Sequence, residues 1–206
     1  VSAQFTRRSE KAVMPRRVEW VKKATTGFAP EQNSVSLDDG SAVSYRVLVA
    51  CPGIKLDWDA IEGLSETLGE NGVTSNYRYD LAPYTNRLVK DMKHGRALFT
   101  QPPMPIKCAG APQKSMYLSC SNWERAGVLK DIDVQFHNSG AVLFGVAAYV
   151  PALMEYIERY NAHLNFESKL VSIDGPAKIA TFEQKRGDTV TRTREPFDMI
   201  HVVPPQ

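Results

Sequence analysis

The stretch "RALFTQPPMPIKCAGAPQKSMYLSCSNWERAG", residues 96–127, decides the fold. It begins with a strand-like run, "RALFTQP", which leads through a turn into a helical pattern over residues 111–126. On that helix the apolar side chains fall on one face: Met116, Cys120 and Trp123. A second strand-like run, "IDVQF" at residues 132–136, follows. A strand, a helix and a strand in this order predict two parallel strands joined by a crossover helix.

The segments that follow extend this pattern. "AAYVPALMEYIERYN" predicts a second helix over residues 147–160, in which Pro151 is tolerable only within the first turn. Its apolar face is expected to hold Tyr149, Leu153, Ile157 and Tyr160. Strand-like runs "HLNFESKLVSI", "KIATFEQ" and "VTRTRE" come next, and "FDMIHVV" reads as an apolar closing strand. We therefore predict an α/β fold with a Rossmann-like, doubly wound parallel sheet.

The part of the chain before residue 96 has a different character. "VEWVKKA", "SVSL" and "VSYRVLVA", within residues 18–50, predict a β-meander with a turn at Gly40 between the last two strands. "YTNRLVKDMK" predicts a short amphipathic helix with its apolar residues at positions 84, 88 and 92. The segment between the meander and this helix reads as an irregular connection.

Composition excludes several classes of protein. The chain has 206 residues, 43% of them hydrophobic, which suits one large or two small globular domains. Its 25 basic and 23 acidic side chains give a formal net charge of +2, so we expect no nucleic-acid partner. No apolar run approaches the roughly 18 to 20 residues of a membrane-spanning helix, and the beginning lacks the apolar core of a signal peptide. Three cysteines without a CxxC pair or a His/Cys cluster indicate neither a disulfide scaffold nor a metal site.

The turn at residues 102–113 is unusual for one that leads from a strand into a helix. A turn that binds a nicotinamide nucleotide needs glycines for close approach to the pyrophosphate, and an acidic residue after the second strand. Here only Gly110 is present, and the second strand ends "VQFHNS". We therefore predict that NAD is not bound. A helix N-terminus with Lys107 and Lys114 nearby instead favours a thiolate at Cys108.

The remaining cysteines and the histidines receive no role. Cys51 ends a strand-like run and Cys120 lies on the apolar helix face, so we predict that both are buried in the core. If Cys108 and Cys120 flank one helix, they are on the order of 18 Å apart, which is too far for a disulfide. The four histidines show no metal-ligand spacing: His94, His137, His163 and His201.

Several segments resemble those of sulfide:quinone oxidoreductases, which are flavoproteins with two dinucleotide-binding domains. They are "ACPGIKLDWDAIEGL", "GVTSNY", "ALFTQPPMPIKCAGAPQKSMYL", "LFGVAAY" and "MIHVVPP", of which "PIKCAGAPQK" is the most specific. The resemblance spans nearly the whole chain and implies the central fragment of such a protein. Residues 1–95 would be part of the FAD domain with its β-meander, residues 96–195 a second, NAD-domain-like Rossmann unit, and residues 196–206 a strand returning toward the FAD domain.

The resemblance implies roles for three residues. Cys108 would be the catalytic half of a redox disulfide that takes up sulfide and carries persulfide sulfur beside the flavin. Its partner cysteine would lie outside this chain. The backbone of Thr25 would contact the FAD adenine, and Gly53 would lie where the chain approaches the flavin. That turn reads "CPG" here, whereas the family has an "ATG" type of turn, which is a departure from the family pattern.

The implied function is oxidation of sulfide, with FAD passing the electrons to quinone. The whole protein would lie at the cytoplasmic face of a membrane, which it would touch through C-terminal segments outside this chain, and a homo-oligomer is compatible with this reading. The fragment alone is expected to be soluble and inactive, and not to retain FAD. Alternatives are a flavocytochrome c sulfide dehydrogenase-like protein or another FAD-dependent oxidoreductase. In another class, a non-catalytic α/β binding module with a structural cysteine also fits.

Overall fold

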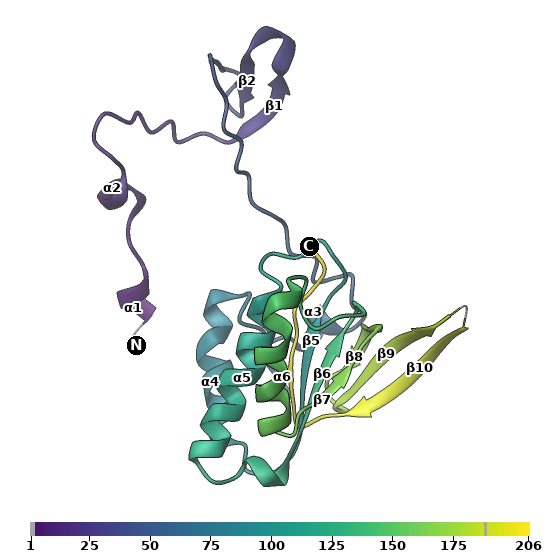
Figure 1. Ribbon diagram of the computed structural model, residues 1–206. Coiled ribbons are helices and arrows are strands. Elements are labelled where there is room, and N and C mark those ends of the chain that lie inside the picture. Colours follow the sequence, from purple (N-terminus) through teal and green to yellow (C-terminus); the bar gives the residue numbers. More distant parts are fainter. Residues whose placement is uncertain (1–2, 188) are drawn as a thin grey trace. The chain divides into compact units, whose positions relative to one another are not determined.

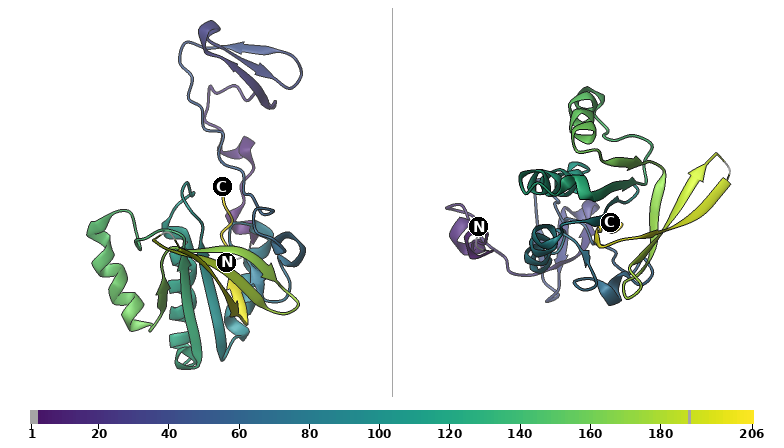
Figure 2. Two further views of the ribbon diagram at one scale, coloured as in Figure 1. Left: turned by 90° about the vertical axis from the view of Figure 1, so that its right-hand side faces the viewer. Right: turned by 90° about the horizontal axis from the view of Figure 1, so that it is seen from below.

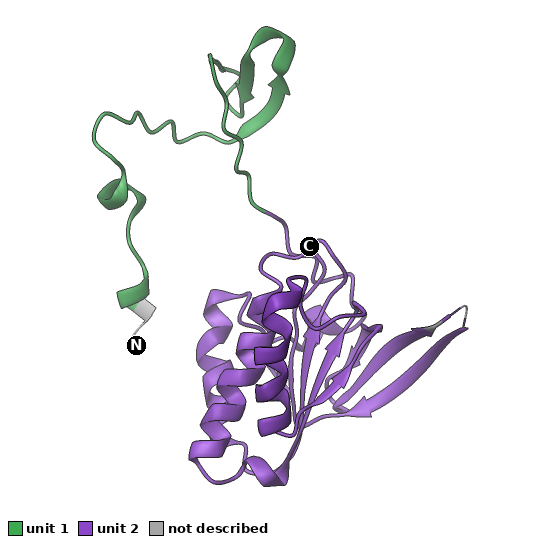
Figure 3. Cartoon of the chain, in the orientation of Figure 1, with its two compact units in different colours: residues 1–53 green, residues 54–206 purple. Residues whose placement is uncertain are grey.

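The computed structural model describes residues 3–187 and 189–206, and the chain divides into two compact units, Val1–Gly53 and Ile54–Gln206 (Figure 3). The expected boundary between residues 95 and 96 divides the chain by function and stays a prediction. Residues 54–94 belong to the second unit because they supply a strand and a helix to its central sheet. Each unit is described by itself.

The first unit is built around a small antiparallel sheet in the order β1-β2-β3. Its elements are α1 (Ala3–Thr6), α2 (Glu10–Val13), β1 (Thr25–Ala29), the 3-10 turn η1 (Pro30–Gln32), β2 (Ser34–Leu37) and β3 (Ala42–Ser44). The predicted meander is confirmed, but "VEWVKKA" lies outside it and the third strand ends at Ser44. Val35 and Leu37 are buried, whereas Val47 and Val49 are exposed. Apolar runs without a layer to pack against gain little from pairing as strands.

The second unit contains the remaining elements. They are α3 (Leu64–Thr67), β4 (Val73–Thr74), η2 (Tyr79–Leu81), α4 (Ala82–Asp91), β5 (Gly95–Gln101), α5 (Gly110–Arg125), η3 (Leu129–Asp131), β6 (Ile132–Asn138), η4 (Ala147–Tyr149), α6 (Val150–Arg159), β7 (His163–Asn165), β8 (Ser168–Asp174), β9 (Ile179–Arg186), β10 (Thr189–Pro196) and β11 (Met199–His201). In the described part of the chain, no helix is long and apolar enough to cross a membrane.

A five-stranded parallel sheet in the order β4-β11-β5-β6-β7 forms the centre of this unit. β5 and β6 pair in parallel from Gly95 opposite Ile132 to Gln101 opposite Asn138, as predicted. From β4 through β5 and β6 to β7, each crossover moves in the same direction across the sheet. Because crossovers of one hand that move in one direction lie on one side, α4, α5 and α6 cover the same face (Figure 1).

The opposite face of the sheet is covered by strands. β8, β9 and β10 form an antiparallel sheet in the order β10-β9-β8, which lies across from the three helices (Figures 1 and 2). The expected α/β fold with a Rossmann-like parallel sheet is confirmed. Its second face carries this sheet and the short helix α3 where a doubly wound fold would place longer helices.

Neighbouring residues of the central strands enter different core clusters. Phe99 of β5 and Met199 of β11 pack on the helix side, whereas Leu98 and Ile200 pack against α3, β8 and β9. All four side chains are buried. Because successive side chains of a strand point to opposite faces, burial of both faces requires apolar residues at consecutive positions.

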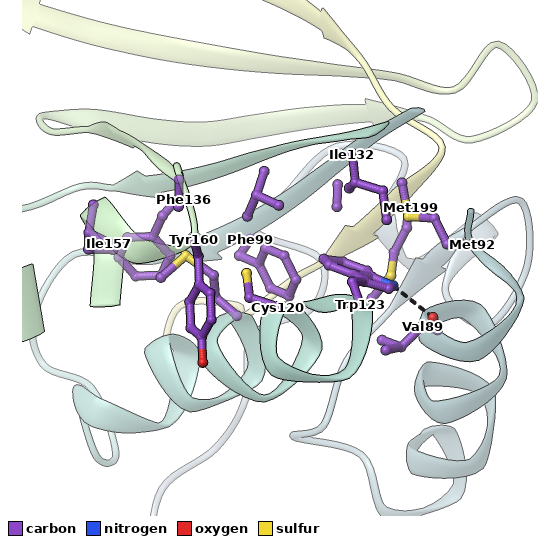
Figure 4. Packing of buried hydrophobic residues seen from close by; sticks show 14 of the residues in the cluster. Val89, Met92, Phe99, Cys120, Trp123, Ile132, Phe136, Ile157, Tyr160 and Met199 are labelled. Carbon is purple, nitrogen blue, oxygen red and sulfur yellow. Dashed lines mark hydrogen bonds between the residues drawn. The ribbon is translucent and has the colours of Figure 1, made fainter. Parts of the chain in front are cut away.

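The helix-side cluster is held together by α5 (Figure 4). Met116, Cys120 and Trp123 are fully buried, which confirms the predicted apolar face. The indole Nε1–H of Trp123 donates to the carbonyl oxygen of Val89 in α4 at 2.8 Å. On α4 itself the buried side chains are Thr85 and Val89, and of the expected face at 84, 88 and 92, Met92 is buried and Leu88 is partly buried against the same cluster.

The second helix also differs slightly from its prediction. Residues 147–149 form the 3-10 turn η4, and α6 begins at Val150 with Pro151 in its first turn, where proline is tolerated. Ile157 and Tyr160 are buried as expected. Tyr149 is exposed because it belongs to the turn and not to the helix.

Replacing Trp123 by Ala is expected to lower the free energy of unfolding by about 3–5 kcal/mol. The change leaves a cavity between α5 and the sheet and removes the donor to Val89. Leu118→Ala on the same helix is the control, because Leu118 is 71% exposed, and it should cost less than about 0.5 kcal/mol. Urea denaturation of both variants measures the difference, and equal losses would contradict the assigned helix face.

Gly72→Ala and Gly127→Ala form a second matched pair, because both glycines have a left-handed backbone, with φ of 85° and 73°. A Cβ at Gly72 would lie 2.3 Å from the carbonyl oxygen of Asp198, whereas nothing lies within 4 Å of a Cβ at Gly127. In both variants the new Cβ destabilises the left-handed backbone of the folded chain by roughly 1–2 kcal/mol. Gly72→Ala should lose about 1–3 kcal/mol more in urea denaturation, since β4 must move away from β11. A smaller loss for Gly72→Ala than for Gly127→Ala would refute this close approach.

Candidate functional site

The candidate site lies at the carboxyl edge of the parallel sheet, where ligands of open α/β folds bind. The turn after β4, the turn after β5 and the segment after β11 meet there. The turns after β4 and β5, the beginning of α5 and residues 54–56 form a pocket of about 330 Å³. Its lining residues are Ile54, Leu56, Asn76, Tyr77, Lys107, Cys108 and Ala111.

Cys108 is exposed in this pocket, two residues before α5 begins at Gly110. Its carbonyl oxygen accepts a hydrogen bond from Ala111 N–H at 2.8 Å. Its φ is 62°, in the left-handed region, which costs a residue with a side chain roughly 1–2 kcal/mol. Such a backbone persists only where its surroundings hold it.

The residue before Cys108, Lys107, is held by hydrogen bonds with two other side chains. The Tyr77 hydroxyl donates to the carbonyl oxygen of Lys107 at 2.8 Å, and the Lys107 N–H donates to Gln206 Oε1 at 2.5 Å. Burial of its ring raises the pKa of Tyr77, the nearby Cys108 raises it further, and the Gln206 side chain opposes both effects. Tyr77 is therefore a neutral hydroxyl donor at physiological pH.

A buried histidine lies beneath the turn after β4. The Nε2 atom of His201 accepts the backbone N–H of Asn76 at 3.0 Å and lies 3.2 Å from Ser115 Oγ. Asn76 Nδ2 in turn donates to Ser115 Oγ at 3.1 Å. Because a backbone N–H can only donate, Nε2 carries no proton, and the neutral ring holds its proton on Nδ1, which has no hydrogen-bond partner among the described residues. Complete burial lowers the pKa of His201 to about 4.

A second concavity lies beside the first, between α4 and α5. It has a volume of about 450 Å³ and shares Asn76 and Ala111 with the Cys108 pocket. Lys114, which the sequence placed near Cys108, lines this second groove, together with Arg125. Of the two lysines expected beside the thiol, Lys107 alone lines the pocket that contains Cys108.

The other predicted site residues belong to the first unit. Thr25 is the first residue of β1 and pairs with Leu37 of β2. Gly53 has a φ of 76°, and the space around its missing Cβ is open. An open left-handed glycine leaves the backbone accessible to a ligand, so the residues present are compatible with a cofactor contact. Cys108 and the other residues that line its pocket lie in the second unit.

The other two cysteines behave differently from each other. Cys120 is fully buried on α5, as predicted, and burial raises the pKa of its thiol to about 12. The prediction that Cys51 is buried is wrong, because Cys51 is exposed. It follows residues 45–50, which do not form the expected strand and therefore do not carry Cys51 into a core.

His137 is a second buried histidine that the sequence gave no reason to single out. Its ring stacks on Phe182 at 3.7 Å between centroids, and its Nδ1 lies 2.9 Å from Ser168 Oγ. Burial, with a smaller contribution from Arg96, lowers its pKa to about 4. His137 therefore joins β6 to the antiparallel sheet and has no place in the Cys108 pocket.

Replacing His201 by Gln is expected to reduce the loss of stability on acidification. Above about pH 6.5 the imidazole is neutral in both the folded and unfolded chain, so it adds no pH dependence. Between about pH 6.5 and 4 the unfolded chain binds a proton that the folded chain does not, so stability falls as the pH falls. The variant should lose about 2 kcal/mol less than the parent between pH 7.5 and 5 in urea denaturation.

His94→Gln is the control for this experiment, because His94 is exposed. It should keep the pH dependence of the parent chain. Equal pH dependence in the His201→Gln variant and the parent would show that His201 takes up its proton in the folded state.

Comparison with known proteins identifies relatives of the chain. No known family profile matches it. It is 38% identical over 205 residues to the mitochondrial sulfide:quinone oxidoreductase of Dictyostelium discoideum, covering 99% of this chain and 44% of that protein. It is 35% identical over 200 residues to the mitochondrial sulfide:quinone oxidoreductase of Mus musculus, covering 96% of this chain and 44% of that protein.

Solved structures share its fold. A chain in the mitochondrial ATP synthase structure of Tetrahymena thermophila aligns with a TM-score of 0.76 at 20% identity, over 94% of this chain and 49% of that one. The sulfide:quinone oxidoreductase of Aquifex aeolicus aligns with a TM-score of 0.69 at 18% identity, over 90% of this chain and 42% of that one. The chain spans less than half the length of the curated relatives it matches. Over nearly its whole length, the sequence of the chain is similar to that of sulfide:quinone oxidoreductases.

Proposed function

We propose that the chain is the central part of a flavoprotein that oxidises sulfide through a redox cysteine pair and FAD and reduces quinone. The observation that carries this proposal is Cys108. It lies exposed in a pocket at the carboxyl edge of the parallel sheet, within the segment "PIKCAGAPQK". A thiol that reacts with a small sulfur nucleophile must be accessible, whereas a packing cysteine such as Cys120 is enclosed.

The chemistry proposed for Cys108 is thiol–disulfide exchange with sulfide. In the oxidised enzyme Cys108 forms a disulfide with a cysteine outside this chain. Hydrosulfide attacks one sulfur, the S–S bond breaks, the attacked cysteine becomes a persulfide, and the other leaves as a thiolate. A nucleophilic acceptor would then take the outer sulfur of the persulfide and leave the pair as two thiolates. Re-forming the disulfide releases the two electrons that the pair gained from sulfide, and bound FAD would accept them and supply them to quinone.

Three segments of the chain would belong to different parts of that protein. Residues 1–95 would belong to the FAD domain, residues 96–195 to a second, NAD-domain-like unit, and residues 196–206 would return toward the FAD domain. Thr25 and Gly53 would contact FAD, which fits the exposed edge of β1 and the open backbone at Gly53. From the end of β5 to the first residue of α5, Gly110 is the single glycine, so the second unit would present Cys108 in place of a nucleotide.

The proposed partners are sulfide and quinone. We also propose that the whole protein is peripheral to a membrane, which it reaches through segments outside this chain, and that it can form a homo-oligomer. Two relatives are named as mitochondrial proteins. A flavocytochrome c sulfide dehydrogenase-like protein would use the same cysteine chemistry with another electron acceptor. The exposure of Cys108 disfavours a binding module with a structural cysteine.

The test replaces Cys108 by Ser in the full-length protein. Sulfide-dependent quinone reduction should fall at least about a hundredfold, because serine forms neither a disulfide nor a persulfide. The flavin absorbance of the purified variant should remain, since Cys108 is not a proposed FAD contact. Cys120→Ala is the matched control, because it removes a buried thiol from the same helix and should retain activity.

Two results would contradict the proposal. A Cys108→Ser enzyme that keeps its sulfide activity would return Cys108 to a structural role. If the parent enzyme reduces quinone with an organic thiol as electron donor but not with sulfide, a different FAD-dependent oxidoreductase would be favoured.

A further inference from the structure

The backbone that leads into Cys108 is held by side chains from two distant segments. The Tyr77 hydroxyl donates to the carbonyl oxygen of Lys107 at 2.8 Å across 30 positions of the sequence. The Lys107 N–H donates to Gln206 Oε1 at 2.5 Å across 99 positions. Both backbone polar groups of the residue before Cys108 are therefore fixed by side chains.

The turn that carries Tyr77 is itself attached to the sheet and to α5. The N–H of Asn76 donates to the buried ring of His201 at 3.0 Å, and its side chain donates to Ser115 at 3.1 Å. The N–H of Tyr77 donates to Ser75 Oγ at 3.1 Å. A continuous set of hydrogen bonds thus runs from β11 and α5 through residues 75–77 to the carbonyl of Lys107.

Cys108 requires such support because its φ of 62° is unfavourable for a residue with a Cβ. The direction of its side chain follows from this backbone conformation. If φ of Cys108 changed from its left-handed value to a right-handed one, the peptide bond between Lys107 and Cys108 would rotate relative to the side chain. The Cα–Cβ bond of Cys108 would then turn away from its present direction in the pocket. The hydroxyl of Tyr77 acts on the peptide bond at which this rotation would occur.

We propose that Tyr77 is a positioning residue for Cys108, acting through its hydrogen bond to the Lys107 carbonyl. Its ring also lines the pocket that contains Cys108, so its two parts have separable effects. The hydroxyl holds the backbone at Lys107, and the ring lines one side of the Cys108 pocket. The relevance of this positioning to sulfide chemistry rests on the proposed function, but the positioning itself does not.

Tyr77→Phe separates the two effects because it keeps the ring and removes the hydroxyl. Tyr84→Phe is the matched control, since the Tyr84 hydroxyl also bonds one backbone group, accepting the Gly72 N–H at 3.0 Å, and Tyr84 does not line the Cys108 pocket. The rates of alkylation of Cys108 are measured in the folded 206-residue chain by peptide mass spectrometry. A small reagent, iodoacetamide, and a bulky one, fluorescein maleimide, are compared, with exposed Cys51 as the internal reference.

The ratio of the bulky to the small reagent's rate at Cys108 should rise at least about threefold in Tyr77→Phe, because loss of one hydrogen bond frees the thiol to leave the pocket. Tyr84→Phe should leave the ratio unchanged. The ratio cancels changes in the intrinsic reactivity of the thiol, and a general loss of structure would be seen as labelling of buried Cys120. An unchanged ratio in Tyr77→Phe, or an equal rise in Tyr84→Phe, overturns the proposal.

A conservative rescue tests the attachment of the turn. His201→Leu removes the acceptor for the Asn76 N–H and should raise the same ratio, whereas His201→Gln supplies an amide oxygen and should leave it closer to that of the parent. Equal ratios in these two variants, with both chains folded, would count against the connection through His201. If either fails to fold, the comparison of Tyr77→Phe with Tyr84→Phe decides.

The full-length protein distinguishes this proposal from the proposed function. There Tyr77→Phe should lower kcat for sulfide-dependent quinone reduction and leave the KM for quinone unchanged. A parent enzyme without sulfide activity but with the expected change in alkylation ratio would refute the function and support the positioning. Sulfide activity in the parent together with an unchanged ratio in Tyr77→Phe would refute the positioning and leave the function supported.

Discussion

The structure of the second unit depends on the burial of a parallel sheet on both faces. Leu98 and Phe99 are consecutive residues of β5, and each is fully buried in a different cluster. In the neighbouring strand β11, Ile200 and Met199 follow the same alternation. Two layers therefore bury the sheet, and the turns after β4 and β5 that line the Cys108 pocket leave it from its carboxyl edge.

Consecutive residues of β11 contribute to the hydrophobic core and to the candidate site. Met199 and Ile200 complete the two hydrophobic clusters, and His201 then supplies a buried acceptor to the turn after β4. A neutral buried imidazole costs less to bury than a charged group, but its Nδ1–H finds no acceptor within the described residues. The fold thus tolerates one unpaired polar atom directly beneath the residues that hold Tyr77 and Cys108 in place.

Much of the second unit could be predicted from short-range patterns. The helical spacing of Met116, Cys120 and Trp123 identified α5 and its buried face, and the strand-like runs around it gave the parallel pair β5 and β6. These predictions succeeded because periodicity is a local property. The position of β11 between β4 and β5 is not local, and neither is the contact between Tyr77 and Lys107.

The errors have the same physical origin. Cys51 looked like a core residue because it follows the apolar run "VSYRVLVA", but an apolar run is buried only where another layer covers it. Lys114 is six residues from Cys108 in the sequence, yet the helix turns it into the groove with Arg125. The left-handed backbone of Cys108 has no signal in the sequence, since glycine or asparagine is the usual occupant of that region.

The order of the strands along the chain also has a kinetic consequence. In β11, Ile200 pairs with Val73 of β4 and with Leu98 of β5, so the central sheet cannot close until residue 200 has left the ribosome. Until then the facing edges of β4 and β5 leave backbone N–H and C=O groups unpaired, and exposed strand edges of this kind favour aggregation.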